Sequence, residues 1–163
     1  MQPHANVRAV QDALDAAGAR DAAGRPSQVR ILEDAAPTAA AAAAQVGVEV
    51  GAIANSLVFD ADGAPLLVLT SGAHRVDTAR VAKEHGIEKV KRASPDFVRA
   101  HTGQVIGGVA PVHPGLPAIR TLVDTALFAF DEVWAAGGIP HAVFPITPAE
   151  LERLTGGTVT DVA

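Results

Sequence analysis

A chain of 163 residues and 16.6 kDa is long enough for one domain, spanning residues 1–163, that buries about two-thirds of the surface of its unfolded chain. It has no cysteine, which excludes disulfides, thiolate nucleophiles and cysteine-ligated zinc. Residues 1–10 lack the apolar stretch of a signal peptide, and no apolar run approaches the ~20 residues of a membrane-spanning helix. We therefore expect an untargeted cytoplasmic protein with no membrane partner.

The net charge of −5 argues against a protein whose whole surface coats nucleic acid, and DNA is not an expected partner. The charge is unevenly distributed, because residues 75–99 contain seven basic and four acidic side chains, a balance of +3 that leaves −8 for the rest. A basic face on an acidic body suits contact with an RNA backbone, and we expect Arg75, Lys91 and Arg92 to supply it. An ordinary solvated helix and strand is the alternative.

Local signals predict the secondary structure in chain order. Apolar residues at helical spacing predict a helix over residues 6–17. The Asp62-Gly63 pair between two apolar runs predicts a β-hairpin. The other expected elements are a strand at 29–32, an alanine-rich helix between Pro37-Thr38 and Gly47, hairpin strands at 53–60 and 66–71, a helix at 76–85, a strand at 88–92, a helix from Ser94 to Thr102, strands at 119–123, 127–134 and 142–146, and a helix at 148–154, with Val159 ending the core.

This order lacks regular βαβ alternation and predicts the α+β class. We expect a single mixed α/β domain with a curved, largely antiparallel or mixed sheet surrounded by short helices.

The loop Gly107-Gly108-Val109-Ala110-Pro111 is the stretch most typical of a binding site. Adjacent glycines let the backbone approach a ligand with no Cβ in the way, and the prolines in and after this stretch stiffen the loop. The same composition also suits a purely structural turn. No Gly-Lys-Ser/Thr or GxGxxG order is present, so this is not one of the familiar phosphate-binding loops.

A series of motifs between residues 55 and 137 resembles the YbaK family, which includes the insertion domain of bacterial prolyl-tRNA synthetase. The resemblance runs from about residue 25 to the C-terminus and rests on Asn55-Ser56-Leu57-Val58-Phe59, Asp62-Gly63, Ser71-Gly72, Arg75-Val76-Asp77, Thr102-Gly103, Gly107 to Pro111, Asp124 and Ala136-Gly137.

That resemblance implies a free-standing editing enzyme that hydrolyses a mischarged small amino acid, such as alanine, cysteine or serine, from tRNA. The tRNA for proline is the expected substrate. The implied partners are the tRNA acceptor end and, in addition, prolyl-tRNA synthetase or an elongation factor. The loop from Gly107 to Pro111 is implied to hold the ester carbonyl and a water against the terminal ribose.

The chain departs from the family at Asn55, where the family usually has a lysine. Asparagine can still donate a hydrogen bond to a carbonyl or a ribose hydroxyl, but it brings no positive charge. Arg75 is a possible spatial substitute for the missing ammonium group. Alternatively, Asn55 only satisfies a strand edge or bulge.

Four further residues are expected to bind substrate: Ser56, Ser71, Asp124 and His141. Asp124 falls where the family has an acidic residue near the pocket, and a turn residue capping its own backbone is the alternative. His141 lies near the position of a histidine in the inserted synthetase domains, and a surface strand histidine is the alternative.

An aminoacyl ester is already activated, so hydrolysis requires mainly positioning and oxyanion stabilisation. A triad of Ser71, His74 and Asp77 is not expected, because no GxSxG elbow is present. The six histidines show no metal-ligand spacing, so we expect neither a metal nor a cofactor. The rival hypotheses are a catalytically silent RNA-binding or synthetase-associated module of the same fold and a hydrolase of small free esters or amides.

Overall fold

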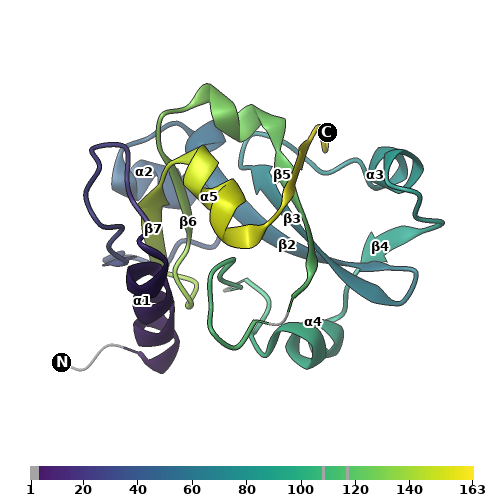
Figure 1. Ribbon diagram of the computed structural model, residues 1–163, viewed down its shortest axis with the longest axis horizontal. Coiled ribbons are helices and arrows are strands. Elements are labelled where there is room, and N and C mark those ends of the chain that lie inside the picture. Colours follow the sequence, from purple (N-terminus) through teal and green to yellow (C-terminus); the bar gives the residue numbers. More distant parts are fainter. Residues whose placement is uncertain (1–3, 108, 117) are drawn as a thin grey trace.

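The computed structural model describes residues 4–107, 109–116 and 118–163, and Figure 1 shows their arrangement. The helices are α1 (Ala5–Ala17), α2 (Ala39–Val46), α3 (Thr78–Glu84), α4 (Pro95–Thr102) and α5 (Pro148–Thr155), with 3-10 helices η1 (Val50–Ala52) and η2 (Thr125–Ala129). The strands are β1 (Arg30–Ile31), β2 (Ile53–Ala61), β3 (Ala64–Ser71), β4 (Val90–Arg92), β5 (Arg120–Asp124), β6 (Val133–Ala136), β7 (Ala142–Ile146) and β8 (Thr158–Thr160).

The strands form one open mixed sheet in the order β1-β7-β6-β2-β3-β5-β8, with β4 paired to β2 outside this path. The pairs β6·β2, β3·β5 and β5·β8 are parallel, whereas β1·β7, β7·β6, β2·β3 and β2·β4 are antiparallel. The predicted mixed α/β architecture is therefore confirmed. Among the described helices, none is long and apolar enough to cross a membrane.

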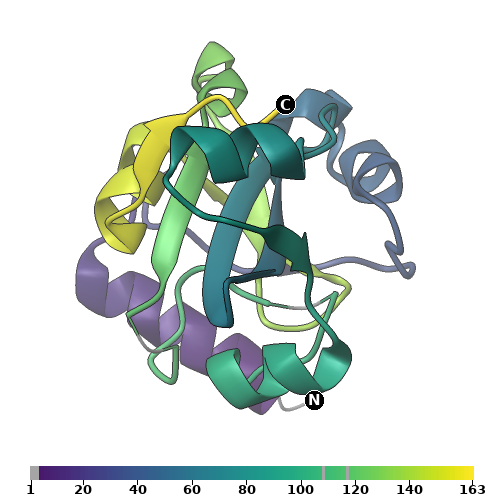
Figure 2. The same cartoon turned by 90° about the vertical axis from the view of Figure 1, so that its right-hand side faces the viewer.

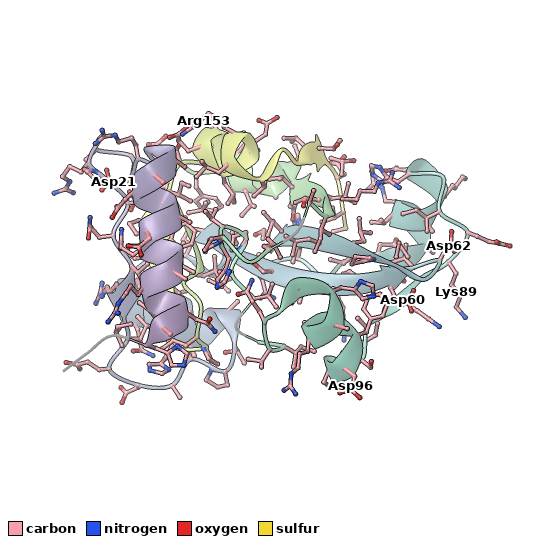
Figure 3. All side chains as sticks on the ribbon, turned by 60° about the horizontal axis from the view of Figure 1, so that its bottom comes forward. Asp21, Asp60, Asp62, Lys89, Asp96 and Arg153 are labelled. Carbon is pink, nitrogen blue, oxygen red and sulfur yellow. The ribbon has the colours of Figure 1, made fainter. Side chains whose placement is uncertain are left out.

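The hairpin between β2 and β3 is the longest pairing in the sheet, and its turn forms as the Asp62-Gly63 signal predicts. Both turn residues have positive φ, 54° at Asp62 and 90° at Gly63, as a two-residue hairpin turn requires. The Gly63 N–H donates to Asp60 Oδ1 at 2.7 Å. The Asp62 carboxylate accepts the N–H groups of Glu88 and Lys89, each at 2.9 Å, and so holds the segment that leads into β4 against the turn. Figure 3 shows Asp60, Asp62 and Lys89 together at this end of the sheet.

Helices cover both faces of the sheet. One core cluster joins Val10 and Leu14 of α1 and Leu151 of α5 to the sheet face that carries Ala54 and Leu69. The opposite face is covered by two further clusters, one built on Val81 and Ala82 of α3 and one on Ala42 and Ala43 of α2. In Figure 2, β4 lies between α3 and α4, so these three elements follow one another along one end of the sheet.

The predicted strand at residues 127–134 is wrong. Residues 125–129 form η2, and the strand β6 begins only at Val133. The Asp124 side chain accepts the Ala126 N–H at 2.9 Å, which starts a helical turn, and Leu127 is fully buried in the core. An apolar run does not distinguish a buried 3-10 turn from a buried strand. The core also continues past Val159, because Val162 is fully buried.

Candidate functional site

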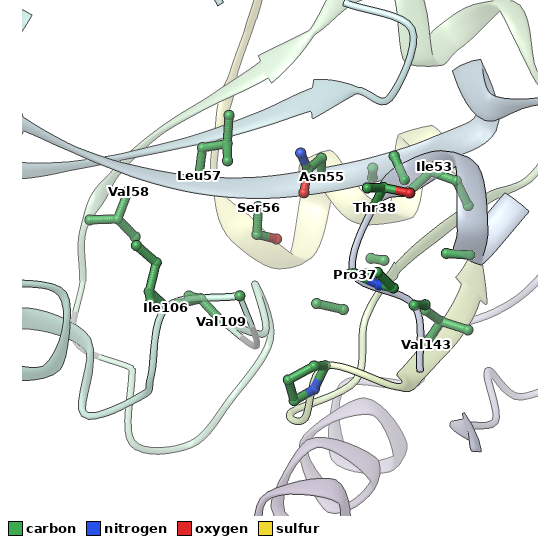
Figure 4. Close-up of a pocket in the computed structure, with 18 of the residues that line it drawn as sticks. Pro37, Thr38, Ile53, Asn55, Ser56, Leu57, Val58, Ile106, Val109 and Val143 are labelled. Carbon is green, nitrogen blue, oxygen red and sulfur yellow. The ribbon is translucent and has the colours of Figure 1, made fainter. Parts of the chain in front are cut away.

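A cavity of about 630 Å³ lies beside the middle of β2. Its walls come from distant parts of the chain: β2 itself, the start of α2, the end of β4, the loop after α4, and the β6–β7 hairpin. Figure 4 shows Pro37, Thr38, Ile53 and Val143 at one end of this cavity and Val58, Ile106 and Val109 at the other. Its volume is within the range of small-molecule sites, about 300–1,000 Å³.

The cavity exists because two strands share one edge of β2. On that edge, β6 pairs with β2 at Ile53 and Ala54, and β4 pairs with it from Phe59 to Ala61. On the other edge, β3 pairs with β2 along residues 54–61. Residues 55–58 are therefore covered by a strand on one edge only, and all four line the cavity.

The polar groups of the cavity are few. Asn55 is exposed on β2, directly opposite Thr70 of β3. Ser56 Oγ and Trp134 Nε1 are both buried without a hydrogen-bond partner among the residues that the structure describes. Arg92 is exposed and is the one charged side chain among the described lining residues. Apart from this cation the walls are mostly apolar, so the site offers hydrogen-bond donors rather than titrating groups.

The glycine-proline loop is divided between two environments. Gly107, with φ of 86°, and the buried Val109 line the cavity, whereas Ala110 and Pro111 do not. Gly108 lies outside the described residues. Ala110 is fixed by the buried side chain of Gln104, whose Oε1 accepts the Ala110 N–H at 2.8 Å and whose Nε2 donates to the Ala110 carbonyl at 3.1 Å. The Ala110 N–H is thus already paired, so it is not a free donor for a substrate.

Pro111 lines a second cavity of about 450 Å³ with Val112, His113 and residues of α1 and α5. His113 Nδ1 accepts the Gly115 N–H at 2.9 Å, which leaves the proton of the neutral ring on Nε2. That nitrogen is buried without a partner among the described residues. Burial lowers the pKa of His113 below its ordinary value of 6.5, because the charged ring loses solvation.

Asp124 and Ser71 do not line the main cavity. Asp124 is buried, and its Oδ2 accepts the Ser71 N–H at 3.0 Å and lies 2.9 Å from His74 Nδ1. Ser71 Oγ donates to the Gly51 carbonyl at 2.8 Å rather than to His74. These bonds, together with the cap on Ala126, join the ends of β3 and β5. They give Asp124 the geometry of a backbone cap. The Ser71 hydroxyl is bonded to Gly51, so the side chains of Ser71 and His74 do not form a catalytic pair.

His141, Arg75 and Lys91 were also predicted to be functional, and all three lie outside the cavity walls. His141 is exposed between the lining residues Pro140 and Ala142, and its carbonyl accepts the Leu32 N–H at 2.7 Å. Arg75 is exposed and does not line the cavity.

The side chains of Lys91 and Arg92, neighbours on β4, have different surroundings. Lys91 Nζ lies 3.9 Å from Asp60 Oδ2, while Arg92 lines the cavity.

Sequence reasoning missed Gln104, Thr38 and Trp134. A lone glutamine has no local signal for its role as a clamp, and Thr38 is readable only as the cap of α2, where it accepts the Ala41 N–H. Trp134 falls within an expected strand, and its being the single tryptophan of the chain does not indicate that it faces a cavity. Among the described residues, no group of three or more His, Cys, Asp or Glu side chains could hold a metal ion.

The fold and the site define a mixed α/β domain with a cavity at a strand edge shared by two neighbouring strands. The chain belongs to the aminoacyl-tRNA editing domain family, whose profile matches residues 33–154. It is 39% identical to a solved structure described as a candidate trans-editing enzyme for prolyl-tRNA synthetase, with a TM-score of 0.87 over 99% of this chain and 98% of that one.

Two sequence relatives extend the comparison. The uncharacterized protein YwhH of Bacillus subtilis (strain 168) is 31% identical over 133 residues, which cover 80% of this chain and 83% of that protein. The proline–tRNA ligase of Nitratidesulfovibrio vulgaris (strain DP4) is 30% identical over 117 residues, which cover 69% of this chain and only 20% of the ligase. This chain is therefore similar to a part of that ligase.

Proposed function

We propose that residues 1–163 act as one free-standing deacylase that hydrolyses the ester of a mischarged small amino acid on tRNA, with the tRNA for proline as the first candidate. The observation that carries the proposal is that Asn55 and Ser56 of β2 and Gly107 of the loop, far apart in sequence, line one cavity. Membership of the editing family supports the reaction class, and the two relatives connected with prolyl-tRNA synthetase support the choice of tRNA.

The lining residues favour hydrolysis by positioning. The described walls contain no histidine, carboxylate or lysine that could act as a general base or carry a covalent intermediate. An activated ester can be hydrolysed without such a group. A water held against the carbonyl and hydrogen-bond donors aimed at the developing oxyanion lower the barrier to its hydrolysis. The side-chain donors among the described lining residues include the Asn55 amide, the unpartnered Ser56 hydroxyl and Trp134 Nε1, and the Arg92 guanidinium.

The mostly apolar walls also favour a small amino acid. Alanines contribute much of the lining, from α2, β2 and β6, and they offer contact surface without charge for an aminoacyl side chain. Alanine, cysteine and serine are the candidates, while correctly charged prolyl-tRNA is expected to survive. The cellular setting that follows from this proposal is cytoplasmic translation, with the tRNA acceptor end as substrate and prolyl-tRNA synthetase or an elongation factor as partner.

The second candidate is a catalytically silent tRNA-binding module of the same fold. Asn55 favours it, because the chain lacks an ammonium group at the position where the family usually has lysine. Under this alternative, tRNA binds at the cavity and the ester persists.

Single-turnover deacylation with excess protein separates the two candidates. Alanyl-, cysteinyl-, seryl- and prolyl-tRNA for proline are each followed against buffer, with tRNA binding measured in parallel. The proposal expects faster loss of at least one mischarged ester and persistence of prolyl-tRNA. Binding of tRNA with no ester cleaved faster than in buffer overturns it in favour of the silent module.

Two variants at Asn55 test its role in the reaction. Asn55→Ala is expected to lower turnover by roughly tenfold or more if the amide donates to the reacting ester or ribose. Asn55→Lys restores the family's usual residue at an exposed position, so the fold should tolerate it and the rate or the preferred amino acid should change. Turnover unaltered by both changes would mean that Asn55 is structural.

A further inference from the structure

The open edge of β2 presents backbone groups whose direction is fixed by the strand register. The Gly72 N–H donates to the Ile53 carbonyl at 2.8 Å, which places the odd-numbered residues of β2 in the hydrogen-bonded pairs with β3. The Asp62 N–H donates to the Lys89 carbonyl at 3.2 Å, which shows that even-numbered residues bond on the other edge. Ser56 and Val58 therefore direct their N–H and C=O groups away from β3.

These groups open on the cavity. The pairing of β2 with β6 ends at Ala54 and its pairing with β4 begins at Phe59, and both Ser56 and Val58 line the cavity between them. Alternation along a strand brings the C=O of one residue and the N–H of the second residue after it to the same edge. The Ser56 C=O and the Val58 N–H thus form a neighbouring acceptor and donor in one plane.

Apolar side chains lie beside this pair. Figure 4 shows Val58 with Ile106 and Val109 at one end of the cavity. Ile106 is 55% exposed and its neighbour Val105 is 46% exposed, whereas Val109 is buried. A flat ring bound edge-on to β2 would cover the exposed surface of Ile106.

The gap limits what can bind. A peptide adding to a sheet edge as a new strand needs a run of free backbone groups, but β6 and β4 close the gap at both ends. A flat group that presents one donor next to one acceptor fits the gap. Adenine has such an edge, formed by its 6-amino group and the ring nitrogen N1. Because this edge lies opposite the ribose, a base entering the gap can present it first.

Resting on the proposed function, in which the substrate ends in the adenosine of tRNA, we propose that the open edge of β2 binds the adenine of that terminal nucleotide. The Ser56 C=O accepts from the 6-amino group, and the Val58 N–H donates to N1. The base is thus identified by main-chain atoms, while side chains handle the aminoacyl group.

The test uses alanyl-tRNA whose 3′-terminal nucleotide is adenosine, purine riboside, 1-deazaadenosine or 7-deazaadenosine. Purine riboside lacks the 6-amino group and 1-deazaadenosine lacks N1, so each should reduce the single-turnover kcat/KM by about three- to tenfold, the effect of one hydrogen bond. The 7-deaza substrate is the matched control and should react like adenosine. Equal rates for all four substrates, or an effect confined to 7-deazaadenosine, overturn the inference.

The protein side of the contact is tested by replacing Val58 with its α-hydroxy acid, which exchanges the backbone N–H for an ester oxygen. This N–H is not part of the β3 ladder, so folding should persist. The variant should react equally with adenosine and 1-deazaadenosine substrates. The same exchange at Ser56 is the control, because the Ser56 N–H lies on the same edge of β2 and is assigned no contact with the base. That variant should still distinguish adenosine from 1-deazaadenosine substrates. Persistent N1 discrimination in the Val58 variant overturns the assignment.

Binding separates this inference from the proposed function. A tRNA ending in 3′-alanylamino-3′-deoxyadenosine cannot be hydrolysed as an ester, and its 1-deaza analogue should bind three- to tenfold more weakly. Base discrimination in binding without any ester hydrolysis would refute the proposed function and keep the inference. Ester hydrolysis without base discrimination would refute the inference and keep the proposed function.

Discussion

Ser56→Ala should stabilise the protein while slowing the reaction. Ser56 Oγ is buried in the cavity wall without a hydrogen-bond partner among the described residues. A buried hydroxyl without a partner costs about 1–3 kcal/mol, so its removal should raise the free energy of unfolding by up to about 1 kcal/mol after the loss of packing contacts. In the complex the same hydroxyl can donate to substrate, and its loss should reduce kcat/KM by about three- to tenfold, or by about 100-fold if it contacts the oxyanion.

Ser71→Ala is the matched control, because it is the same substitution on the neighbouring strand. Ser71 Oγ is buried but donates to the Gly51 carbonyl at 2.8 Å, so its removal leaves that carbonyl unpaired. The free energy of unfolding should fall by about 1–3 kcal/mol, with kcat/KM unchanged at temperatures where the variant is folded. Urea unfolding and single-turnover deacylation measure both quantities. A Ser56→Ala variant that is destabilised as much as Ser71→Ala, or that keeps wild-type kcat/KM, would refute the reasoning.

Three further predictions concern the loop, the cavity cation and the buried histidine. Gly107→Ala and Gly103→Ala should each lower the free energy of unfolding, measured by urea denaturation, by about 1–2 kcal/mol, because both positions have positive φ although a Cβ would meet open space. Only Gly107→Ala should slow deacylation. Arg92→Gln should reduce the magnitude of the slope of log affinity against log salt in tRNA titrations by about 0.7, the value for one single-strand phosphate contact. Lys91→Gln is the control, and an equal effect of that change would contradict a special role for Arg92 in the cavity. His113→Asn keeps an acceptor for the Gly115 N–H and removes the histidine whose pKa burial lowers. Below about pH 6.5 the unfolded chain takes up a proton at His113 that the folded chain resists, so wild-type stability should fall from about pH 7 to about pH 5 more steeply than that of the variant. Thermal unfolding at several pH values measures this, and an equal pH dependence of the two proteins would count against it.

The local parts of the fold were predictable from the sequence. The Asp62-Gly63 turn, the cap at Ser94 and the stop at Gly47 depend on neighbouring residues, and the structure confirms each of them. The strand expected at residues 127–134 failed for a non-local reason, since η2 is fixed by the Asp124 cap and by burial of Leu127.

The site was predictable only in part. The meeting of Asn55 and Ser56 with Gly107 followed from the family resemblance and agrees with the cavity walls. The contribution of Trp134 depends on the parallel pairing of β6 with β2, and the clamp of Gln104 on Ala110 depends on the path of the loop. Neither has a local sequence signal, because each arises from the way distant segments pack.

The sharing of one β2 edge by β4 and β6 has a consequence for the order of folding. The chain between Phe59 and its partner Arg92 on β4 is short, and the Asp62 carboxylate holds Lys89 within it. The chain between Ile53 and its partner Trp134 on β6 is far longer. Loop closure costs more entropy as the intervening chain lengthens, so the β2–β3–β4 unit should form before β6 docks. The cavity would then take shape only after that unit has formed, at the step in which β6 docks on β2.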